Sequence, residues 1–201
     1  ETNPAIDVNH SDAITGTKQI NMLGLKSPYI LITEENVPMV RGASQTYGLG
    51  FTPGPWIESI QVTKGMGSVI NGFESIVGQI NTELKKPLTD IPLLLNLFNS
   101  NNGRVELNTQ VKSIVSEKIS TSFFAHYNKR DQSNDKNSDS FLDKPLQSQI
   151  NLINRWQYTN AVKGLVSFFN IRVLDDLKKI GQIGSQYDVS KWGGRVKTNR
   201  F

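Results

Sequence analysis

The feature that most constrains this chain is an alternation of apolar and polar residues with a period of two, which recurs through the second half of the sequence. In the stretch after Gly103, Val105, Leu107 and Val111 occupy odd positions, while charged or amide side chains occupy the even ones. Successive side chains of a β-strand point to opposite faces, so this alternation predicts strands with one apolar and one polar face. The second half of the chain is therefore expected to form an antiparallel sheet.

The alternation predicts five strands and the start of a sixth. Their segments are 93–99, 103–112, 119–128, 149–158, 165–173 and 195–201. After the first link, the connections alternate between short (116–118, 159–161) and long (129–148, 175–194). Transmembrane barrels alternate in this way between short periplasmic turns and longer extracellular loops. The long connections are then expected on the outside of the cell.

Two architectures fit such strands. A barrel strand crosses a membrane with only about 9 to 11 residues, whereas a soluble sandwich packs its apolar face into a core. A hydrophobic content of 37% and a mean hydropathy of −0.36 are typical of a soluble protein and do not separate the two. The sequence does exclude helical spans, since no segment approaches the roughly 20 consecutive apolar residues that they need. A soluble β-rich binding module stays open at this point.

The first part of the chain has a different pattern of residues. Short apolar segments bounded by Gly, Pro or Asn lie at 29–32, 56–62 and 78–84. They predict short strands joined by turns, with one or two brief helices, in a small α+β domain. The residue pattern changes near Pro87, so residues 1–87 are expected to form one domain and residues 88–201 the alternating strands.

One long motif lies between residues 56 and 87. It runs through Ile57-Glu58, Lys64-Gly65, Gly78-Gln79-Ile80-Asn81 and Lys85-Lys86-Pro87. This order resembles the end of the plug domain in TonB-dependent outer-membrane receptors, and within that family the chain looks Bacteroidetes-like. Segments 19–25 and 29–38 are similar to two earlier plug segments. Leu23 departs from the family's usual Arg, and Glu35-Asn36 replaces Asp-Gly.

The resemblance implies an α+β plug domain, represented by its C-terminal portion at 1–87. Antiparallel transmembrane β-barrel strands follow at 88–201, and the barrel is incomplete in this chain. It implies a place in the outer membrane of a Gram-negative cell and active uptake of a scarce nutrient, such as a ferric siderophore, another metal chelate or cobalamin. Energy would come from a TonB-type coupling protein through a segment that is not in this chain. The alternative is a receptor-like structural or assembly subunit of an outer-membrane complex, without transport.

Other partners follow from the same reasoning. Outer-membrane lipid and the small nutrient ligand are expected, and so is contact with other outer-membrane proteins or lipoproteins. Nucleic acid is not expected, because the Lys and Arg residues are scattered and the net charge is only +4. An enzyme is not expected either. His10-Ser11-Asp12 has the letters of a catalytic triad, but adjacent residues do not converge on one nucleophile.

Candidate ligand-binding residues follow from the resemblance. In the family, plug loops that face outward contact the ligand, and the loop after the Val-Pro segment is one of them. The residues at that position are Pro38, Met39, Val40, Arg41, Gln45 and Tyr47. Arg41 suits an anionic group and Tyr47 suits stacking.

The first long connection contains oxygen-bearing side chains at relative positions 1, 3, 5 and 9 of one segment. These residues are Asp135, Asn137, Asp139 and Asp143. Their spacing is similar to the start of a calcium-binding loop, although Ser140 replaces the usual Gly and Leu146 replaces the closing Glu. A structural calcium ion is therefore one hypothesis for this loop, and a polar surface loop is the other. No other cofactor is expected, because the chain has no Cys and only two His.

Overall fold

The computed structural model describes residues 4, 6–10, 18–40, 48, 50–67, 74–183 and 193–200. The chain forms two compact units, Glu1–Leu84 and Lys85–Phe201. The boundary between them in the sequence follows Leu84, three residues before Pro87. The sequence pattern changes near Pro87. Assigning the units to a plug and a barrel stays a prediction.

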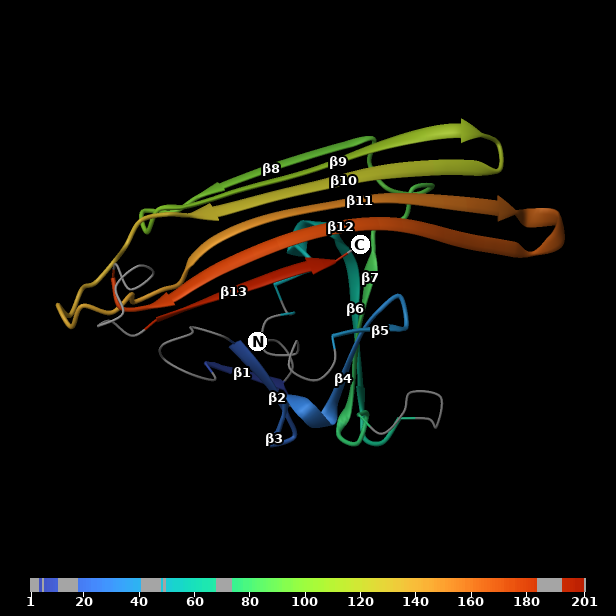
Figure 1. Ribbon diagram of the computed structural model, residues 1–201. Coiled ribbons are helices and arrows are strands. Elements are labelled where there is room, and N and C mark those ends of the chain that lie inside the picture. The colour runs from blue at the N-terminus through green and yellow to red at the C-terminus, as the bar shows by residue number, and fades with distance from the viewer. Residues whose placement is uncertain are drawn as a thin grey trace. The chain divides into compact units, whose positions relative to one another are not determined.

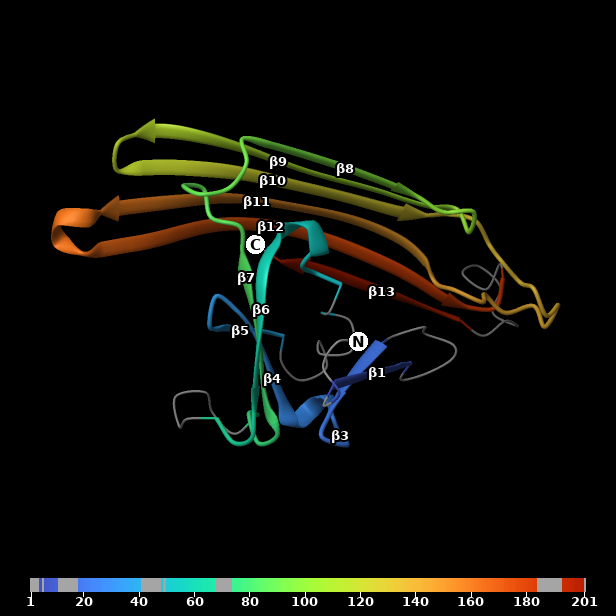
Figure 2. The ribbon, with the colours of Figure 1, turned by 180° about the vertical axis from the view of Figure 1, so that it is seen from behind.

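The second unit is a six-stranded antiparallel sheet with the order β13-β12-β11-β10-β9-β8. The strands are β8 (Leu93–Asn99), β9 (Arg104–Ser116), β10 (Ile119–Arg130), β11 (Leu146–Asn160), β12 (Leu165–Gly181) and β13 (Gly193–Arg200). Each strand pairs with its neighbours in sequence, so the sheet is a meander (Figures 1 and 2).

Local chemistry sets the tight turns of this sheet. Between β11 and β12 the chain makes the 3₁₀ turn η5 (Ala161–Lys163), and the side-chain oxygen of Asn160 accepts a 3.2 Å hydrogen bond from the amide of Lys163. Gly164 then closes the turn in the left-handed region, with φ of 61°. A side chain there would be strained, so this turn favours glycine.

All six predicted strands are present, and β9, β10, β11 and β12 are longer than the alternation predicts. The largest difference is in β12, which continues to Gly181 although the sequence predicts a loop from Asp175 onwards. Asp175 and Asp176 interrupt the apolar pattern without interrupting the backbone ladder, where they pair with Ile150 and Gln149. The prediction of that boundary was wrong because side-chain polarity was read as the end of the strand.

The first unit contains two small sheets among its described residues. One has the order β1-β2-β3, from β1 (Ile6–His10), β2 (Lys18–Met22) and β3 (Leu25–Lys26). The other has the order β5-β4-β7-β6, from β4 (Ile30–Glu34), β5 (Val37–Val40), β6 (Ile57–Lys64) and β7 (Gly78–Leu84). The pair β4–β7 is parallel, and the other pairs are antiparallel.

The elements that can be bounded in this unit are strands and the 3₁₀ turns η1 (Ser27–Tyr29) and η3 (Gly54–Trp56). Gly48 has helical backbone, but its neighbours lie outside the described residues. The β part of the predicted α+β domain is therefore present, and its helical part is not shown. Nowhere in the described ranges is a helix both long and apolar enough to cross a membrane.

A small apolar core holds the first unit together. Met22, Ile30, Val77 and Ile80 are buried, and Ile20 is among the residues that pack against them. The core constrains Gly78 at the start of β7, where a Cβ atom would lie 2.3 Å from the Thr63 carbonyl oxygen and 2.5 Å from the Met22 sulfur. Only glycine fits that approach without a shift of the backbone.

The turn between β4 and β5 explains how Glu35-Asn36 replaces Asp-Gly. Both residues have positive φ, 55° and 62°, as the hairpin turn requires of its two central residues. The Glu35 amide donates to the Thr82 carbonyl oxygen at 2.9 Å, and the Asn36 amide donates to the Asn81 side-chain oxygen at 2.8 Å. The Glu35 carboxylate also accepts the Leu84 amide at 2.8 Å. Contacts with β7 therefore hold this turn.

Candidate functional site

The six-stranded sheet has two faces of opposite polarity, and its apolar face is the exposed one. Leu97 on β8, Phe169 on β12 and Ile171 on β12 expose 70%, 62% and 54% of their surfaces. Large apolar residues continue across the strands between them, among them Leu107, Val111, Phe123, Tyr127, Ile150 and Trp156. A soluble sandwich buries its apolar face. This sheet has the reverse arrangement, which argues against that alternative.

The opposite face carries polar side chains, and these are buried. Asn108 and Gln110 on β9, Asn151 and Arg155 on β11 each have a relative exposure of 0%. Arg155 also lies over the Phe168 ring, with its guanidinium carbon 4.4 Å from the ring centroid. A buried polar face with an exposed apolar face is the pattern of a strand between lipid and an aqueous interior.

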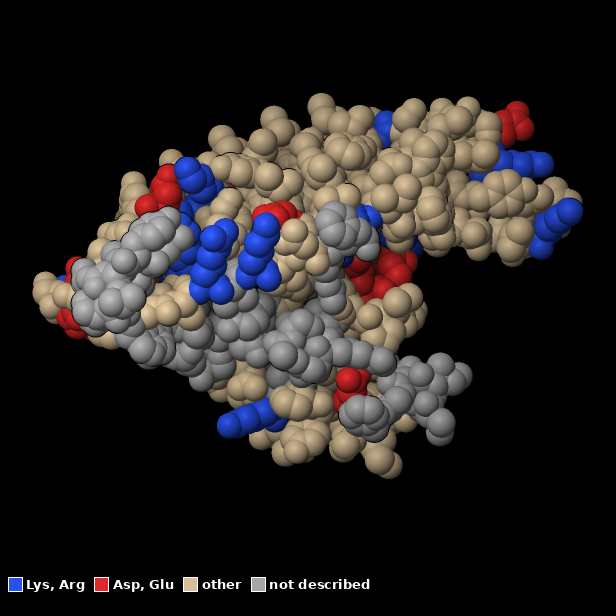
Figure 3. Space-filling view, viewed as in Figure 1, with Lys and Arg blue, Asp and Glu red and all other residues tan. Residues whose placement is uncertain are grey.

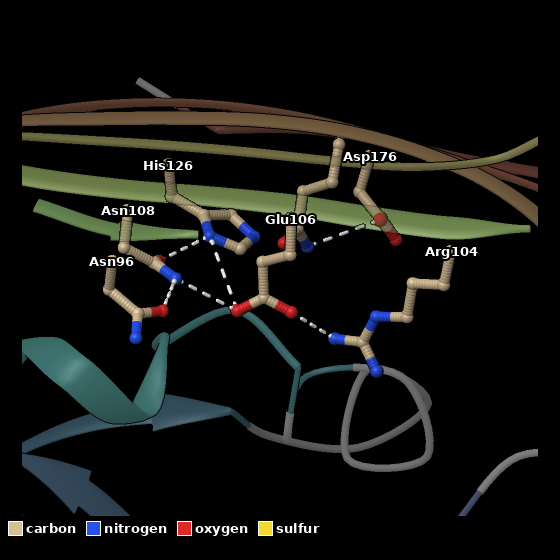
Figure 4. Close-up of polar contacts among 7 residues, drawn as sticks. Asn96, Arg104, Glu106, Asn108, His126 and Asp176 are labelled. Carbon is tan, nitrogen blue, oxygen red and sulfur yellow. Dashed lines mark hydrogen bonds and ion pairs between the residues drawn. The ribbon is translucent and has the colours of Figure 1, made fainter. Parts of the chain in front are cut away.

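The densest group of polar contacts on the buried face lies near the end of the sheet that carries the long loops. We call it the polar cluster, and its members are Asn96, Arg104, Glu106, Asn108, His126, Gln149 and Asp176 (Figure 4). The register explains its composition, because Asn96, Asn108 and His126 are directly opposite one another on β8, β9 and β10. Five strands thus contribute side chains to the cluster.

Asn108 is the centre of one half of the cluster. Its Nδ2 donates to Glu106 Oε1 at 3.0 Å and to Asn96 Oδ1 at 3.3 Å. Its Oδ1 lies 2.6 Å from His126 Nδ1. Since Nδ2 already donates to two oxygens, Oδ1 is the acceptor, and the hydrogen of the imidazole is placed on Nδ1. Arg104 pairs with the other carboxylate oxygen of Glu106.

The other half of the cluster is built around Asp176, which has a relative exposure of 1%. Gln149 Nε2 donates to Asp176 Oδ1 at 3.2 Å, and Lys178 Nζ lies 3.3 Å from Asp176 Oδ2. A buried carboxylate needs such partners because the loss of hydration is costly. Both acids of the cluster are therefore paired with a cation.

The chemistry of this cluster is hydrogen bonding and ion pairing. Within the described ranges, no three His, Cys, Asp or Glu side chains come close enough together to hold a metal ion. In the polar cluster itself, no Ser, Thr or Cys stands beside His126 as a nucleophile. An amide- and ion-lined wall of this kind suits contact with water and a polar solute. Sequence reasoning placed His126 on the polar face, but it missed the cluster, which only the strand register brings together.

The predicted ligand-binding residues lie partly outside the described residues. Pro38 and Met39 are on β5, where Pro38 is exposed and Met39 is half-buried, with its sulfur 3.4 Å from the Thr52 hydroxyl oxygen. Val40 ends β5, and its backbone pairs with Ile32. Arg41, Gln45 and Tyr47 lie outside the described residues. Their role in ligand binding stays a prediction.

The predicted calcium loop is held by its own backbone amides. Asp135 accepts the amides of Asp139 at 3.2 Å and Ser140 at 2.9 Å, one on each carboxylate oxygen. Asp139 accepts the Phe141 amide and the Asn137 side chain, both at 2.8 Å. Asp143 accepts the Lys136 amide at 3.0 Å. Each carboxylate is thus engaged within the loop, and calcium binding stays a prediction.

Comparisons with known proteins give a likeness of fold. No protein-family model matches the chain, and no curated protein matches it. Among solved structures, the F3-3 variant of the FrpB iron transporter from Neisseria meningitidis matches 88% of this chain and 28% of its own, with a TM-score of 0.63 at 14% identity. The F5-1 variant of that transporter, in its apoprotein form, matches 90% of this chain and 29% of its own, with a TM-score of 0.60 at 15% identity.

At these identities the likeness shows the fold alone. The chain spans less than a third of the length of those two transporters. It therefore has the fold of part of the FrpB iron transporter.

Proposed function

We propose that this chain is part of a Bacteroidetes-like TonB-dependent outer-membrane receptor that takes up a scarce nutrient. In this proposal, residues 1–87 belong to the plug domain and residues 88–201 form the first strands of the barrel. The observation that carries the proposal is the six-stranded sheet with an exposed apolar face and a buried polar face. The FrpB-like fold supports it.

The dimensions of the apolar face agree with an outer membrane. On β10 it extends from Ile119 to Tyr127, about 27 Å along the strand at about 3.4 Å per residue. Strands of membrane barrels tilt by roughly 35–45°, which reduces that span to about 21 Å across the bilayer. The apolar band of such barrels is about 25 Å tall.

The polar face then lines the interior of the barrel. Its amides and paired charges offer donors and acceptors to a hydrated solute, and the paired acids do not present an uncompensated charge that would trap a cation. This wall is suited to passage, and selection of the ligand falls to the plug apex, with Arg41 and Tyr47 as the central candidates.

The cargo belongs to the class of scarce nutrients, and iron is the favoured member because the two similar structures are iron transporters. A ferric siderophore, another metal chelate or cobalamin would each present the polar surface that this wall accommodates. The coupling protein would act through a segment that is not in this chain.

The decisive experiment deletes the gene and measures two properties of the strain and the protein. Fractionation is expected to place the protein in the outer membrane, and the deletion strain is expected to lose uptake of one radiolabelled substrate among ferric siderophores, free iron salts and cobalamin. Recovery of the protein in the soluble fraction would overturn the proposal. Outer-membrane location with unchanged uptake of every substrate would instead favour the structural or assembly role.

The ligand assignment needs its own variants. An Arg41→Ala receptor is expected to bind an anionic chelate at least 10-fold more weakly, since a charge-assisted hydrogen bond is lost. Lys26→Ala, an exposed position on β3, removes the same charge elsewhere in the first unit and serves as the control. Equal affinity in both variants would exclude Arg41 from the ligand site.

A further inference from the structure

The chain between β7 and β8 is a turn held on the polar face of the six-stranded sheet. These strands are joined by residues 85–92, which we call the strap. The strap belongs to the second unit and is the green connection between β7 and β8 in Figures 1 and 2. The Lys86 carbonyl oxygen accepts the amides of Thr89 at 3.3 Å and Asp90 at 3.2 Å. The strap is therefore folded and is not an extended linker.

Polar side chains of β9 and β11 bind the strap. Lys112 Nζ donates to the carbonyl oxygens of Asp90 at 2.5 Å and Leu88 at 3.3 Å. Gln110 Nε2 donates to Asp90 Oδ2 at 2.5 Å, and Gln157 Oε1 accepts the Leu88 amide at 3.2 Å. These four hydrogen bonds join two residues of the strap to the sheet.

The contacts reach across three strands. Lys112 on β9 is directly opposite Ser122 on β10, which is directly opposite Arg155 on β11. Gln157 follows Arg155 by two residues, so it shares the polar face. Gln110 and Gln157 expose 0% and 6% of their surfaces, so water competes little for their hydrogen bonds. The strap is thus tied to the body of the sheet and not to β8 alone.

Two further contacts hold the ends of the strap. Lys85 Nζ lies 3.8 Å from Asp90 Oδ1, so Asp90 is held by a cation of the strap and by Gln110 of the sheet. At the other end, the amide of Lys112 donates to the Pro92 carbonyl oxygen at 2.8 Å, directly before β8. The strap is therefore fixed from its first residue to its last.

The strand that follows the strap is exposed to any movement of the chain before it. β8 ends the strand order of the sheet and pairs only with β9 among the described strands. An edge strand opens locally more easily than a strand that is paired on both sides. If the strap were slack, a displacement of the first unit would act on this edge directly.

The sheet is the fixed body to which the strap is tied. Large apolar residues are exposed on one of its faces, and in the proposed receptor lipid surrounds that face and holds the sheet in place. Figure 3 shows Lys and Arg side chains near both ends of the sheet and along its front edge, with uncharged residues between. A strap on the polar face is then tied to the part of the protein that moves least.

We propose that the strap is a mechanical stop between the two units. Motion or local unfolding of the first unit ends at the contacts of Leu88 and Asp90 with the sheet, and β8 keeps its pairing with β9. This inference goes beyond uptake of a nutrient and rests on the proposed barrel, which holds the sheet. It assigns Gln110, Lys112 and Gln157 to the strap and not to the ligand.

A pulling experiment tests the stop directly. The complete protein that contains this chain is folded in a lipid bilayer and extended from its N-terminal end by atomic force microscopy. Extension is expected to pause at Leu84, and residues 85–99 should then follow as a separate step of about 50 Å, at about 3.5 Å per residue. In Gln110→Met with Lys112→Met, three of the four side-chain hydrogen bonds are lost, and the separate step is expected to disappear.

Hydrogen exchange tests the same coupling without applied force. Gly78→Ala would place a Cβ atom 2.3 Å from the Thr63 carbonyl oxygen and so loosen the first unit. With the strap intact, exchange of the β8 amides in this variant is expected to stay parental. Adding Lys112→Met removes two charge-assisted hydrogen bonds, and β8 exchange is then expected to be at least about 10-fold faster.

Two matched variants show whether the effect belongs to the strap. Lys118→Met changes the same residue type at an exposed position in the turn between β9 and β10, and it is expected to keep the separate step and the parental exchange. Lys112→Arg keeps a cationic donor and is expected to retain both properties. Resistance of the folded barrel to unfolding in detergent would check that each variant is folded.

Four results would overturn the inference. They are the absence of a separate step in the parent, a parental step in the Gln110→Met, Lys112→Met variant, faster β8 exchange in Gly78→Ala alone, and an equal effect of Lys118→Met. A protein that folds in lipid vesicles and gives any of these results keeps its proposed barrel and loses only the stop. A parent protein that does not fold in vesicles would contradict the proposed barrel and, with it, the stop.

Discussion

His126 on β10 donates a hydrogen bond to the Asn108 side chain on β9 across 2.6 Å, and the two residues are directly opposite in the ladder. The same amide donates to Glu106 and to Asn96 on β8. One buried side chain therefore links three strands through three hydrogen bonds. Its donor and acceptor atoms are not interchangeable.

Asn108→Asp should destabilise the second unit. The substitution keeps the shape but replaces the Nδ2 donor with an oxygen that faces the Glu106 carboxylate at 3.0 Å. Loss of buried hydrogen bonds costs about 1–3 kcal/mol, and the repulsion of two carboxylates adds to it. Urea unfolding of the detergent-folded protein would measure the loss. Asn170→Asp, at an exposed position of β12, is the control, and equal midpoints for the two variants would contradict this account.

Ile171→Arg should impair folding in a bilayer. Ile171 lies in the apolar face, and arginine near the midplane of a barrel costs about 2–4 kcal/mol. Asn170→Arg places the same side chain on the other face of the same strand and should cost less than about 1 kcal/mol. Folding yield in lipid vesicles would compare them. A similar yield for both would mean that this face does not contact lipid.

Gly78→Ala should loosen the first unit. The added Cβ would meet the Thr63 backbone at 2.3 Å, and such overpacking costs about 1–3 kcal/mol. Gly54→Ala is the control, because the space around that Cβ is open. Hydrogen exchange of the β6 and β7 amides should be faster only in the first variant. Unchanged exchange of these amides would show that β6 and β7 accommodate the added Cβ without a loss of stability.

Two substitutions in the Glu35-Asn36 turn should have different effects on stability. Glu35→Ala removes the acceptor of the Leu84 amide and should cost about 1 kcal/mol. Asn36→Gly should be neutral or slightly stabilising, because glycine adopts the positive φ of 62° more easily. Exchange of the Leu84 amide would report the first effect. A loss of stability in Asn36→Gly would indicate that the Asn36 side chain has a role beyond the turn.

Asp135→Ala should open the loop between β10 and β11. Asp135 accepts two backbone amides of that loop, so its removal is expected to increase cleavage there by an added protease. The increase should be the same with calcium or with a chelator if the hydrogen bonds alone hold the loop. Protection of the parent protein that requires calcium would instead support the calcium hypothesis.

Much of the six-stranded sheet could be predicted because each strand carries its own period-two pattern. The segment at Leu93–Asn99 was correct to the residue. The end of β12 was wrong, since Asp175 and Asp176 are polar but continue the ladder. The choice between a lipid-facing and a core-facing apolar surface could not be made from alternation, because both give the same sequence pattern.

The polar cluster was beyond sequence reasoning for a different reason. Asn96, Asn108 and His126 meet because of the register between strands, and a shift by one residue would send them to the other face. The turn at Glu35-Asn36 was identified as a departure from the family, but the contacts with β7 that hold it depend on the parallel pairing of β4 with β7.

That parallel pairing also affects the order in which the protein acquires its structure. Ile30 pairs with Gly78, so β4 and β7 can meet only after the long chain segment between them has closed into a loop. In the other sheet of the first unit, β1, β2 and β3 follow one another along the chain and can be added one at a time through hairpins. Non-local contacts slow folding, and the four-stranded sheet should therefore be the kinetic bottleneck of the first unit.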